Sequence, residues 1–137
     1  MVHALNLGRG LLKPEGLLVN VNNLPVPAAI EVRTDQGRIT AGWILDKTEF
    51  ESERSAFGAL AEVVSQGSFT LESERDFTFH IHSVDFDELQ IYLSEWWESA
   101  VLPEKTSRRV EKIIKECAHV SDIVLKVPTR MSALKSV

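Results

Sequence analysis

The chain has 137 residues, of which 44% are hydrophobic and 26% charged, and its formal net charge is −5. This composition is typical of a folded domain and excludes a disordered or fibrous chain. No apolar run approaches the ~20 residues that a membrane span needs, and the first residues lack the regions of a signal peptide. The single Cys117 cannot form an internal disulfide, which fits a reducing cytoplasm.

The charges are unevenly distributed along the chain. Residues 1–103 carry 7 basic and 16 acidic side chains, whereas residues 104–137 carry 8 basic and 4 acidic side chains. Nucleic acids usually require a concentrated basic face, which this pattern does not provide. We therefore expect neither a nucleic-acid partner nor a membrane partner.

The N-terminal region predicts a helix followed by a strand. The helix covers residues 3–13 and ends at the turn formed by Pro14 and Gly16. Residues 17–21 then form a short, almost continuous apolar run. Such a run is typical of a strand that is covered on both faces, as in a parallel sheet.

The next segment predicts a β-hairpin. Ile30, Val32 and Thr34 alternate with charged residues, and apolar residues recur at every second position over residues 39–45, beyond the turn sequence TDQG. The proline-rich residues 24–27 are expected to form a connector.

A capping box of Thr48 and Glu51 predicts a helix that continues to Gln66 and stops at Gly67. The sequence DFTFHIHSV that follows predicts a strand with one apolar face. Asp85 and Glu88 begin another helix, and its stripe of core residues includes Trp96. The adjacent Trp97 points about 100° away from that stripe.

The C-terminal region predicts a last helix and a last strand. Pro103 suits the first position of the helix. The sequence SDIVLKVPTRMSALK predicts a strand with a bulge or an edge after Val127, because Pro128 cannot donate to a sheet. We therefore predict a single α/β domain over residues 1–137, with α+β character: a small mixed sheet with an added β-hairpin, covered by three to four helices.

Three segments resemble one known family. GRGLLKPEGLLVNVNN resembles the part of class I S-adenosylmethionine-dependent methyltransferases in which a helix leads, through an LKPGG-like turn, into the fifth strand. RDFTFHIHSVDFDELQIYLSEWW is similar to the sixth strand and the helix after it, and SDIVLKVPTRMSALK to the final strand. The resemblance spans nearly the whole chain but covers only the C-terminal half of the family's domain.

The half without a counterpart is the one that binds the cofactor. In that family a glycine-rich turn after the first strand and an acidic residue after the second hold S-adenosylmethionine. The seven glycines of this chain are scattered, and none forms a G-x-G turn between a strand and a helix. The resemblance therefore implies no cofactor in the isolated chain, and S-adenosylmethionine only if a partner completes the fold.

The resemblance also implies an association. In the complete fold the fifth strand lies between a parallel strand and the final, antiparallel strand. Without the first half, residues 17–21 lose one neighbour, and an exposed apolar edge invites pairing with another chain. We expect a homodimer or a complementary cofactor-binding half as the partner.

The predicted function is thus a methyltransferase-like half domain that is non-catalytic alone and acts through self-association or a partner. One alternative is an S-adenosylmethionine-dependent methyltransferase in which a separate chain supplies the cofactor-binding half, that is, an enzyme completed in trans. Whether the chain takes part in an enzyme is therefore left open. The other is a small-molecule binding module that uses a cavity below the hairpin.

Candidate site residues follow from the same resemblance. Asn20, Asn22 and Asn23 close the strand at its carboxyl end, where open α/β sheets bind ligands and where this family faces its methyl acceptor. With Trp43 they are the predicted substrate-binding residues, although asparagine is also a common turn-forming residue. His80 and His82 have a spacing that metal sites use, but a site needs at least a third ligand. We predict no metal site and no catalytic residue.

Overall fold

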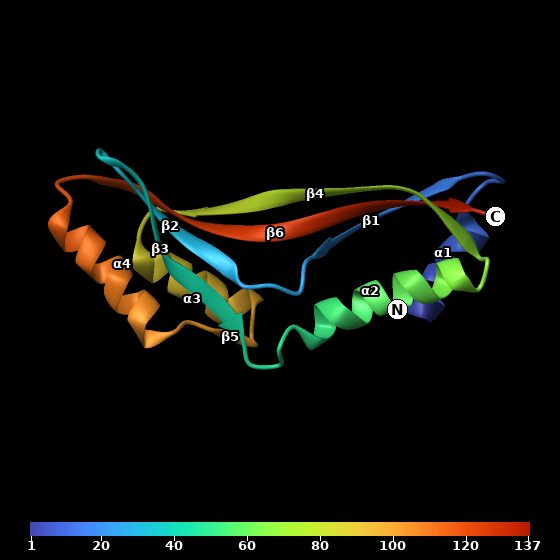
Figure 1. Ribbon diagram of the computed structural model, residues 1–137, viewed down its shortest axis with the longest axis horizontal. Helices are drawn as coiled ribbons and strands as arrows, with labels where there is room; N and C mark the ends of the chain where they lie inside the picture. Colours follow the sequence, from blue (N-terminus) through green and yellow to red (C-terminus); the bar gives the residue numbers. More distant parts are fainter. The chain divides into compact units, whose positions relative to one another are not determined.

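The computed structural model describes all 137 residues as a mixed α/β fold with four helices and a six-stranded, mostly antiparallel open sheet (Figure 1). The predicted fold class is confirmed. None of the four helices combines the length and hydrophobicity that a membrane span requires. In chain order the elements are α1 (Val2–Leu11), β1 (Leu17–Asn23), β2 (Ala28–Thr34), β3 (Gly37–Asp46), α2 (Glu51–Ser65), β4 (Phe69–Ser83), α3 (Phe86–Trp96), β5 (Ala100–Val101), α4 (Glu104–Glu116) and β6 (Val120–Ser136).

The chain divides into two compact units. Unit 1 comprises Met1–Pro25, Phe50–Phe77 and Thr129–Val137, and unit 2 comprises Val26–Glu49 and Thr78–Pro128. The long strands β4 and β6 each contribute one part to each unit. The prediction of a single domain stays a prediction.

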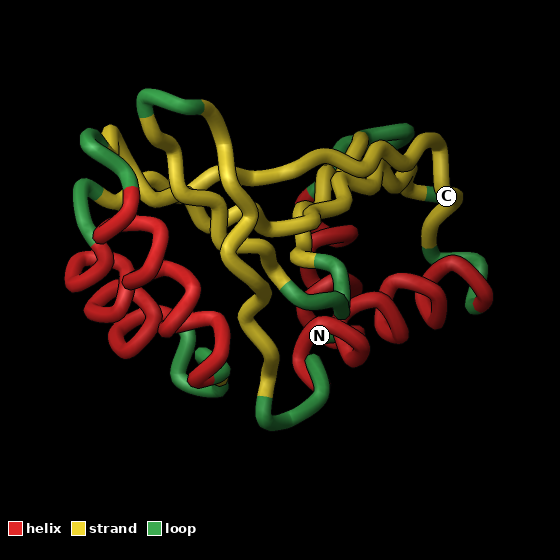
Figure 2. Tube along the Cα trace, turned by 60° about the vertical axis from the view of Figure 1, so that its left-hand side comes forward, coloured by secondary structure: helices red, strands yellow, loops and turns green.

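In unit 1, β1 pairs antiparallel with β6, in a register that runs from Leu17 opposite Lys135 to Asn23 opposite Thr129. The helices α1 and α2 lie on one side of these strands (Figure 2). They bury a small core with the strands because apolar residues recur at helical spacing on α2. This core consists of Leu5, Ala59, Leu60, Val63, Phe69 and Leu134.

Helix α2 ends where the sequence predicts. Gly67 has a φ of 74°, a left-handed conformation that glycine adopts without steric cost. The amide of Gly67 donates to the Val64 carbonyl and the amide of Ser68 to the Val63 carbonyl, both over 3.0 Å. These two bonds form a Schellman motif, which satisfies carbonyls at the helix end.

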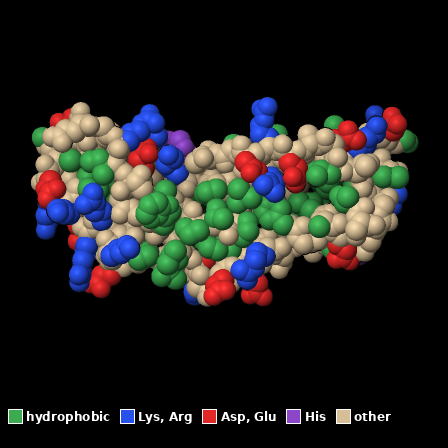
Figure 3. Space-filling model, viewed as in Figure 1, with side chains coloured by type: hydrophobic (Ala, Val, Ile, Leu, Met, Phe, Trp, Pro, Cys, Tyr) green, Lys and Arg blue, Asp and Glu red, His purple; other side chains and the backbone are tan.

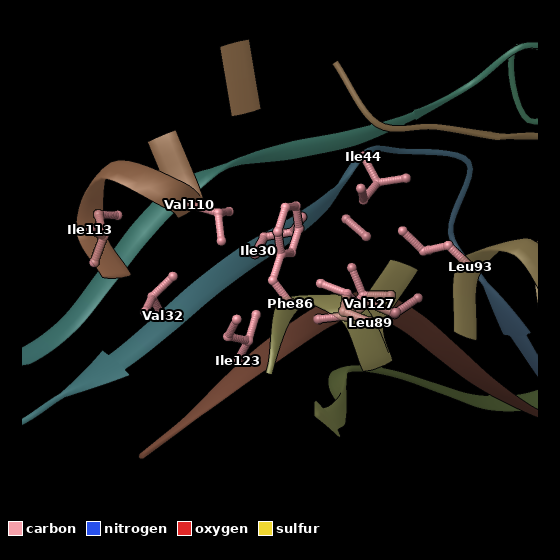
Figure 4. Close-up of a cluster of buried hydrophobic side chains, with 12 residues drawn as sticks. Ile30, Val32, Ile44, Phe86, Leu89, Leu93, Val110, Ile113, Ile123 and Val127 are labelled. Carbon is pink, nitrogen blue, oxygen red and sulfur yellow. The ribbon is translucent and has the colours of Figure 1, made fainter. Parts of the chain in front are cut away.

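In unit 2, β2 pairs antiparallel with β3 in the predicted hairpin and with the N-terminal part of β6. The helices α3 and α4 close one face of these strands, and hydrophobic side chains from both layers fill the space between them (Figure 4). The buried members of this core are Ala28, Ile30, Val32, Ile44, Phe86, Leu89, Leu93, Val110, Ile113, Ile123, Leu125 and Val127.

Strand β6 continues through Pro128, and the set of residues that it buries changes after Thr129. Odd-numbered residues such as Ile123, Leu125 and Val127 are buried in the core of unit 2, whereas Ser132 and Leu134 are buried in unit 1. Thr129, beyond the proline, is also buried at an odd-numbered position. The residue pairs of β6 with β2 end at Lys126 and those with β1 begin at Thr129, so the predicted bulge or edge after Val127 stays a prediction.

Two predictions about the strand β1 and the start of helix α2 are wrong. The side chains of Leu17, Val19 and Val21 are 56%, 58% and 54% exposed, because the helices of unit 1 cover only one face of β1. Thr48 does not cap α2, whose N-cap is Phe50 in a left-handed conformation. Instead the amide and the hydroxyl of Thr48 donate to Asp46.

The prediction that Trp96 packs in the core is wrong. Trp96 is 75% exposed, whereas Trp97 is half-buried against the core of unit 2. Helix α3 ends at Trp96, and Trp97 already has non-helical φ and ψ of −136° and 74°. The helical spacing therefore does not set the direction of Trp97, whereas Trp96, the last residue of the helix, is exposed although this spacing places it on the core stripe.

Candidate association edge and binding pocket

Strand β1 has one unpaired edge. It lies at the end of the strand order and hydrogen-bonds only to β6. The amide of Ser136 donates to the carbonyl of Gly16 over 3.0 Å, immediately before the β1–β6 ladder begins. In an antiparallel pair the residues alternate in the edge to which their amides and carbonyls point. The even-numbered residues of β1 thus bond to β6, and Val19 and Val21 present their backbone groups to the free edge.

The asparagines of β1 lie where the sequence predicts, at its carboxyl end. Asn20 and Asn22 are half-buried and share the face of the strand that the helices cover, whereas Asn23 is exposed. Asn20 is opposite Ser132, and Asn22 is opposite Arg130. The side-chain amide nitrogens of Asn20 and Asn22 are buried and have no hydrogen-bond partner. Their role in binding a substrate stays a prediction.

Trp43 belongs to unit 2, whereas the three asparagines belong to unit 1. Its side chain is 54% exposed, while its neighbour Ile44 is completely buried in the core. Trp43 therefore lies on the face of β3 that the helices leave open. The four predicted substrate-binding residues do not gather within one unit.

A pocket of about 430 Å³ lies between α2 and the strands of unit 1 and is open to solvent. Its walls are mostly apolar, and three polar side chains from β4 and β6 converge on it. Figure 3 shows hydrophobic side chains gathered over the region of β1 and α2, with a small group of acidic and basic side chains among them. The lining residues are Phe57, Leu60, Ala61, Val64, Ser65, Leu71, Leu134 and the polar Glu74, Arg130 and Ser132.

The Arg130 guanidinium is held at the edge of this pocket by a neighbouring carboxylate. Its Nε and Nη2 donate to the two oxygens of Asp76 over 2.6 and 3.0 Å. The hydrogen bond from Arg130 lowers the pKa of Asp76, and the same bond raises the pKa of Arg130. The guanidinium carbon also lies 5.8 Å from the ring centre of Phe57, within the range of a cation–π contact.

Glu74 is less well compensated than Asp76. The Ser132 hydroxyl donates to its Oε1 over 3.3 Å, and Nη1 of Arg130 lies 3.9 Å from its Oε2. The first contact is neutral and the second is long, whereas Asp76 accepts two charge-assisted bonds. Glu74 therefore provides an accessible negative charge at the polar end of the pocket.

The pocket residues Glu74, Arg130 and Ser132 are not among the site residues predicted from the sequence. The predicted strand begins near Asp76 and leaves Glu74 outside any element, whereas β4 begins at Phe69. Glu74 and Asp76 stand two positions apart, as Arg130 and Ser132 do, and both pairs lie on strands. Residues two positions apart on a strand point to the same face. Two acidic residues at this spacing, together with an arginine and a serine at the same spacing on another strand, are the signal that could have revealed this site.

Asp46 forms the most fully satisfied polar cluster of unit 2. Its Oδ1 accepts from the amide and hydroxyl of Thr48 over 2.8 and 2.5 Å, and its Oδ2 accepts from Trp97 Nε1 and Ser99 Oγ over 2.9 and 2.5 Å. Burial alone would raise the pKa of Asp46, but the hydrogen bonds from Ser99, Thr48 and Trp97 hold it well below its usual range. The cluster joins the end of β3 to the turn after α3, which indicates a structural role.

The two histidines of β4 form no metal centre. His82 Nδ1 lies 2.6 Å from the Oδ2 of Asp122, and the rings of His80 and His82 meet edge to face with centroids 6.1 Å apart. No group of three or more histidine, cysteine, aspartate or glutamate side chains is arranged to hold a metal ion.

Comparison with family models, with curated proteins and with solved structures finds no match to this chain.

Proposed function

We propose that this chain is a methyltransferase-like half domain that is non-catalytic alone and works by pairing along β1 with a second polypeptide, which is another copy of itself. The resemblance of its three segments to the fifth, sixth and final strands of that family provides the starting point. The observation that carries the proposal is the free, apolar edge of β1.

The strand pairing of unit 1 supports the half-domain interpretation. The segment similar to the fifth strand, β1, runs antiparallel to the segment similar to the final strand, β6, as the resemblance implies. Strand β4, which contains the segment similar to the sixth strand, also pairs with β6. It lies along the other edge, since Ser132 is opposite Asn20 of β1 and also bonds to Glu74 of β4.

The exposed face of β1 supports association through this strand. Leu17, Val19 and Val21 follow one another on a single face, and Met131 of β6, which is opposite Val21, is also exposed. An edge strand is normally protected by charges, proline or a covering element. The central residues of β1 include no charged residue and no proline. The free edge of β1 therefore presents both unpaired backbone groups and exposed apolar side chains.

Two copies of β1 can pair antiparallel about Val19. The amide and the carbonyl of Val19 both point to the free edge, so that two such residues can exchange both hydrogen bonds across a two-fold axis. This arrangement places the exposed valines of the two copies side by side on one face. The two β1–β6 ladders then become parts of one continuous sheet.

The test is size-exclusion chromatography with light scattering over a dilution series, with two matched variants. We expect a dimer that dissociates on dilution, and a monomer for Val19→Lys because a charge blocks an edge. Val84→Lys is the control, since Val84 is 74% exposed outside any strand and should leave the dimer unchanged. A wild-type monomer at every concentration, or equal effects of the two variants, contradicts the proposal.

Calorimetry separates this function from the enzymatic alternative. The chain has no glycine-rich turn between a strand and a helix with which to hold S-adenosylmethionine, so titration of the cofactor into the chain should release no heat. Saturable binding of the cofactor would favour a methyltransferase instead.

A further inference from the structure

We propose that the pocket of unit 1 binds a small organic amine, whose apolar body lies against α2 and whose ammonium group pairs with Glu74. This inference goes beyond the proposed function, because it concerns the helix-covered face of the sheet and not the free edge of β1.

The size and the walls of the pocket fit a small molecule. Its volume of about 430 Å³ lies within the range of ligand sites, which combine apolar walls with a few converging polar groups. Helix α2 supplies one wall, through Phe57, Leu60 and Val64, and Leu71 and Leu134 add apolar surface from the strands. These side chains would exclude water from an aliphatic ligand body.

The charges of the polar end select a cation. Glu74 and Asp76 supply two negative charges and Arg130 one positive charge, which already forms two short hydrogen bonds to Asp76. The remaining negative charge resides on Glu74, whose nearest cationic atom is 3.9 Å away. An ammonium group would supply the charge-assisted hydrogen bonds that Glu74 lacks.

The same geometry disfavours an anionic ligand. A carboxylate or phosphate at this end would need Arg130, which Asp76 engages through both Nε and Nη2. It would also stand next to the carboxylate of Glu74, which has only one long ion pair, and like charges at short range repel.

A series of three ligands of equal chain length tests this selection. Binding of hexylammonium, hexan-1-ol and hexanoate is followed by NMR chemical-shift titration of the full chain at neutral pH. We expect saturable shifts at Leu71, Glu74 and Leu134, with hexylammonium about fivefold tighter than hexan-1-ol, as a partly exposed ion pair allows. Hexanoate should bind most weakly.

Three variants locate the interaction. Glu74→Gln keeps the acceptor for Ser132 and removes the charge, so that hexylammonium and hexan-1-ol should bind equally. Ala61→Trp, at an exposed position of the pocket wall, should fill the pocket and abolish binding. Ser55→Trp is the control, because Ser55 is exposed on α2 outside the pocket and the change should leave binding intact.

The results separate this inference from the proposed function. Val19→Lys should keep full hexylammonium binding even though it removes the association along β1. Absence of saturable binding, a preference for hexanoate, or undiminished amine preference in Glu74→Gln overturns the inference. Equal affinity of the wild type for the amine and the alcohol also overturns it, since the pocket would then recognise only apolar surface.

Discussion

The indole Nε1 of Trp97 donates a hydrogen bond to the Oδ2 of Asp46 over 2.9 Å and so joins the end of α3 to the end of β3. Trp97→Phe keeps most of the ring but leaves this bond unmade, and should lower the free energy of unfolding by about 1–3 kcal/mol. Trp96→Phe is the control and should change it by less than about 0.5 kcal/mol, because Trp96 is largely exposed. Urea denaturation measures both, and equal effects would contradict the assignment of Trp97 to the Asp46 cluster.

The free energy of unfolding at low pH should depend on Asp46. Its pKa is lower in the folded chain than the value of 3.8 for an unperturbed carboxyl group, because the bonds from Ser99, Thr48 and Trp97 outweigh its burial. A lowered pKa means that its stabilisation is fully present above about pH 3.8 and declines as the pH falls below that value. In urea denaturation the difference in stability between wild type and Asp46→Asn should therefore shrink on acidification below pH 3.8. A difference that stays constant down to the most acidic pH at which the chain folds would contradict this view.

Gly42 permits the close approach of α4 to β3. A Cβ atom at this position would lie 2.4 Å from Thr106 Oγ1 and 2.8 Å from its Cγ2. Gly42→Ala should therefore destabilise the fold by about 1–3 kcal/mol, as overpacking does. Gly58→Ala provides the contrast: a Cβ there meets nothing within 4 Å, and the change should stabilise α2 by about 0.5–1 kcal/mol. Thermal unfolding of the two variants should shift the midpoint in opposite directions, and a shift in the same direction would exclude this packing.

The buried amide of Asn20 should cost the fold stability. Its Nδ2 is buried without a hydrogen-bond partner, and an apolar residue of similar shape would remove that penalty. Asn20→Leu should raise the free energy of unfolding by about 1 kcal/mol. Asn23→Leu, at the exposed end of β1, should leave it nearly unchanged. Chemical denaturation checks the pair, and destabilisation by Asn20→Leu would mean that its amide is satisfied in the folded protein.

Local sequence patterns predicted the elements with strong local causes. The hairpin followed from alternation on both sides of a short turn, and the end of α2 from Gly67, whose left-handed φ glycine favours. The start of α3 followed from Asp85, whose side chain accepts from the Glu88 amide. In these cases the cause lies within a few residues of the effect.

The failed predictions depend on residues far apart in the chain. Thr48 does not cap α2 but donates to Asp46, and the side chains that bind the other oxygen of Asp46, Trp97 and Ser99, are 51 and 53 positions away from it in the sequence. The apolar run of β1 indicates a strand but does not reveal that the chain covers only one of its faces. Glu74 and Arg130, 56 positions apart in the sequence, meet only because β4 pairs with β6.

Amide hydrogen exchange along β1, measured as a function of protein concentration, tests the central claim most directly. Leu18, Asn20 and Asn22 direct their amides to β6 and should be protected at every concentration. Val19 and Val21 direct their amides to the free edge. If two copies pair along this edge, the protection of both amides should rise with protein concentration. In the Val19→Lys variant, the amide of Val21 should lose this protection. Rapid exchange of Val19 and Val21 at all concentrations would show that the edge stays unpaired and would contradict association through β1.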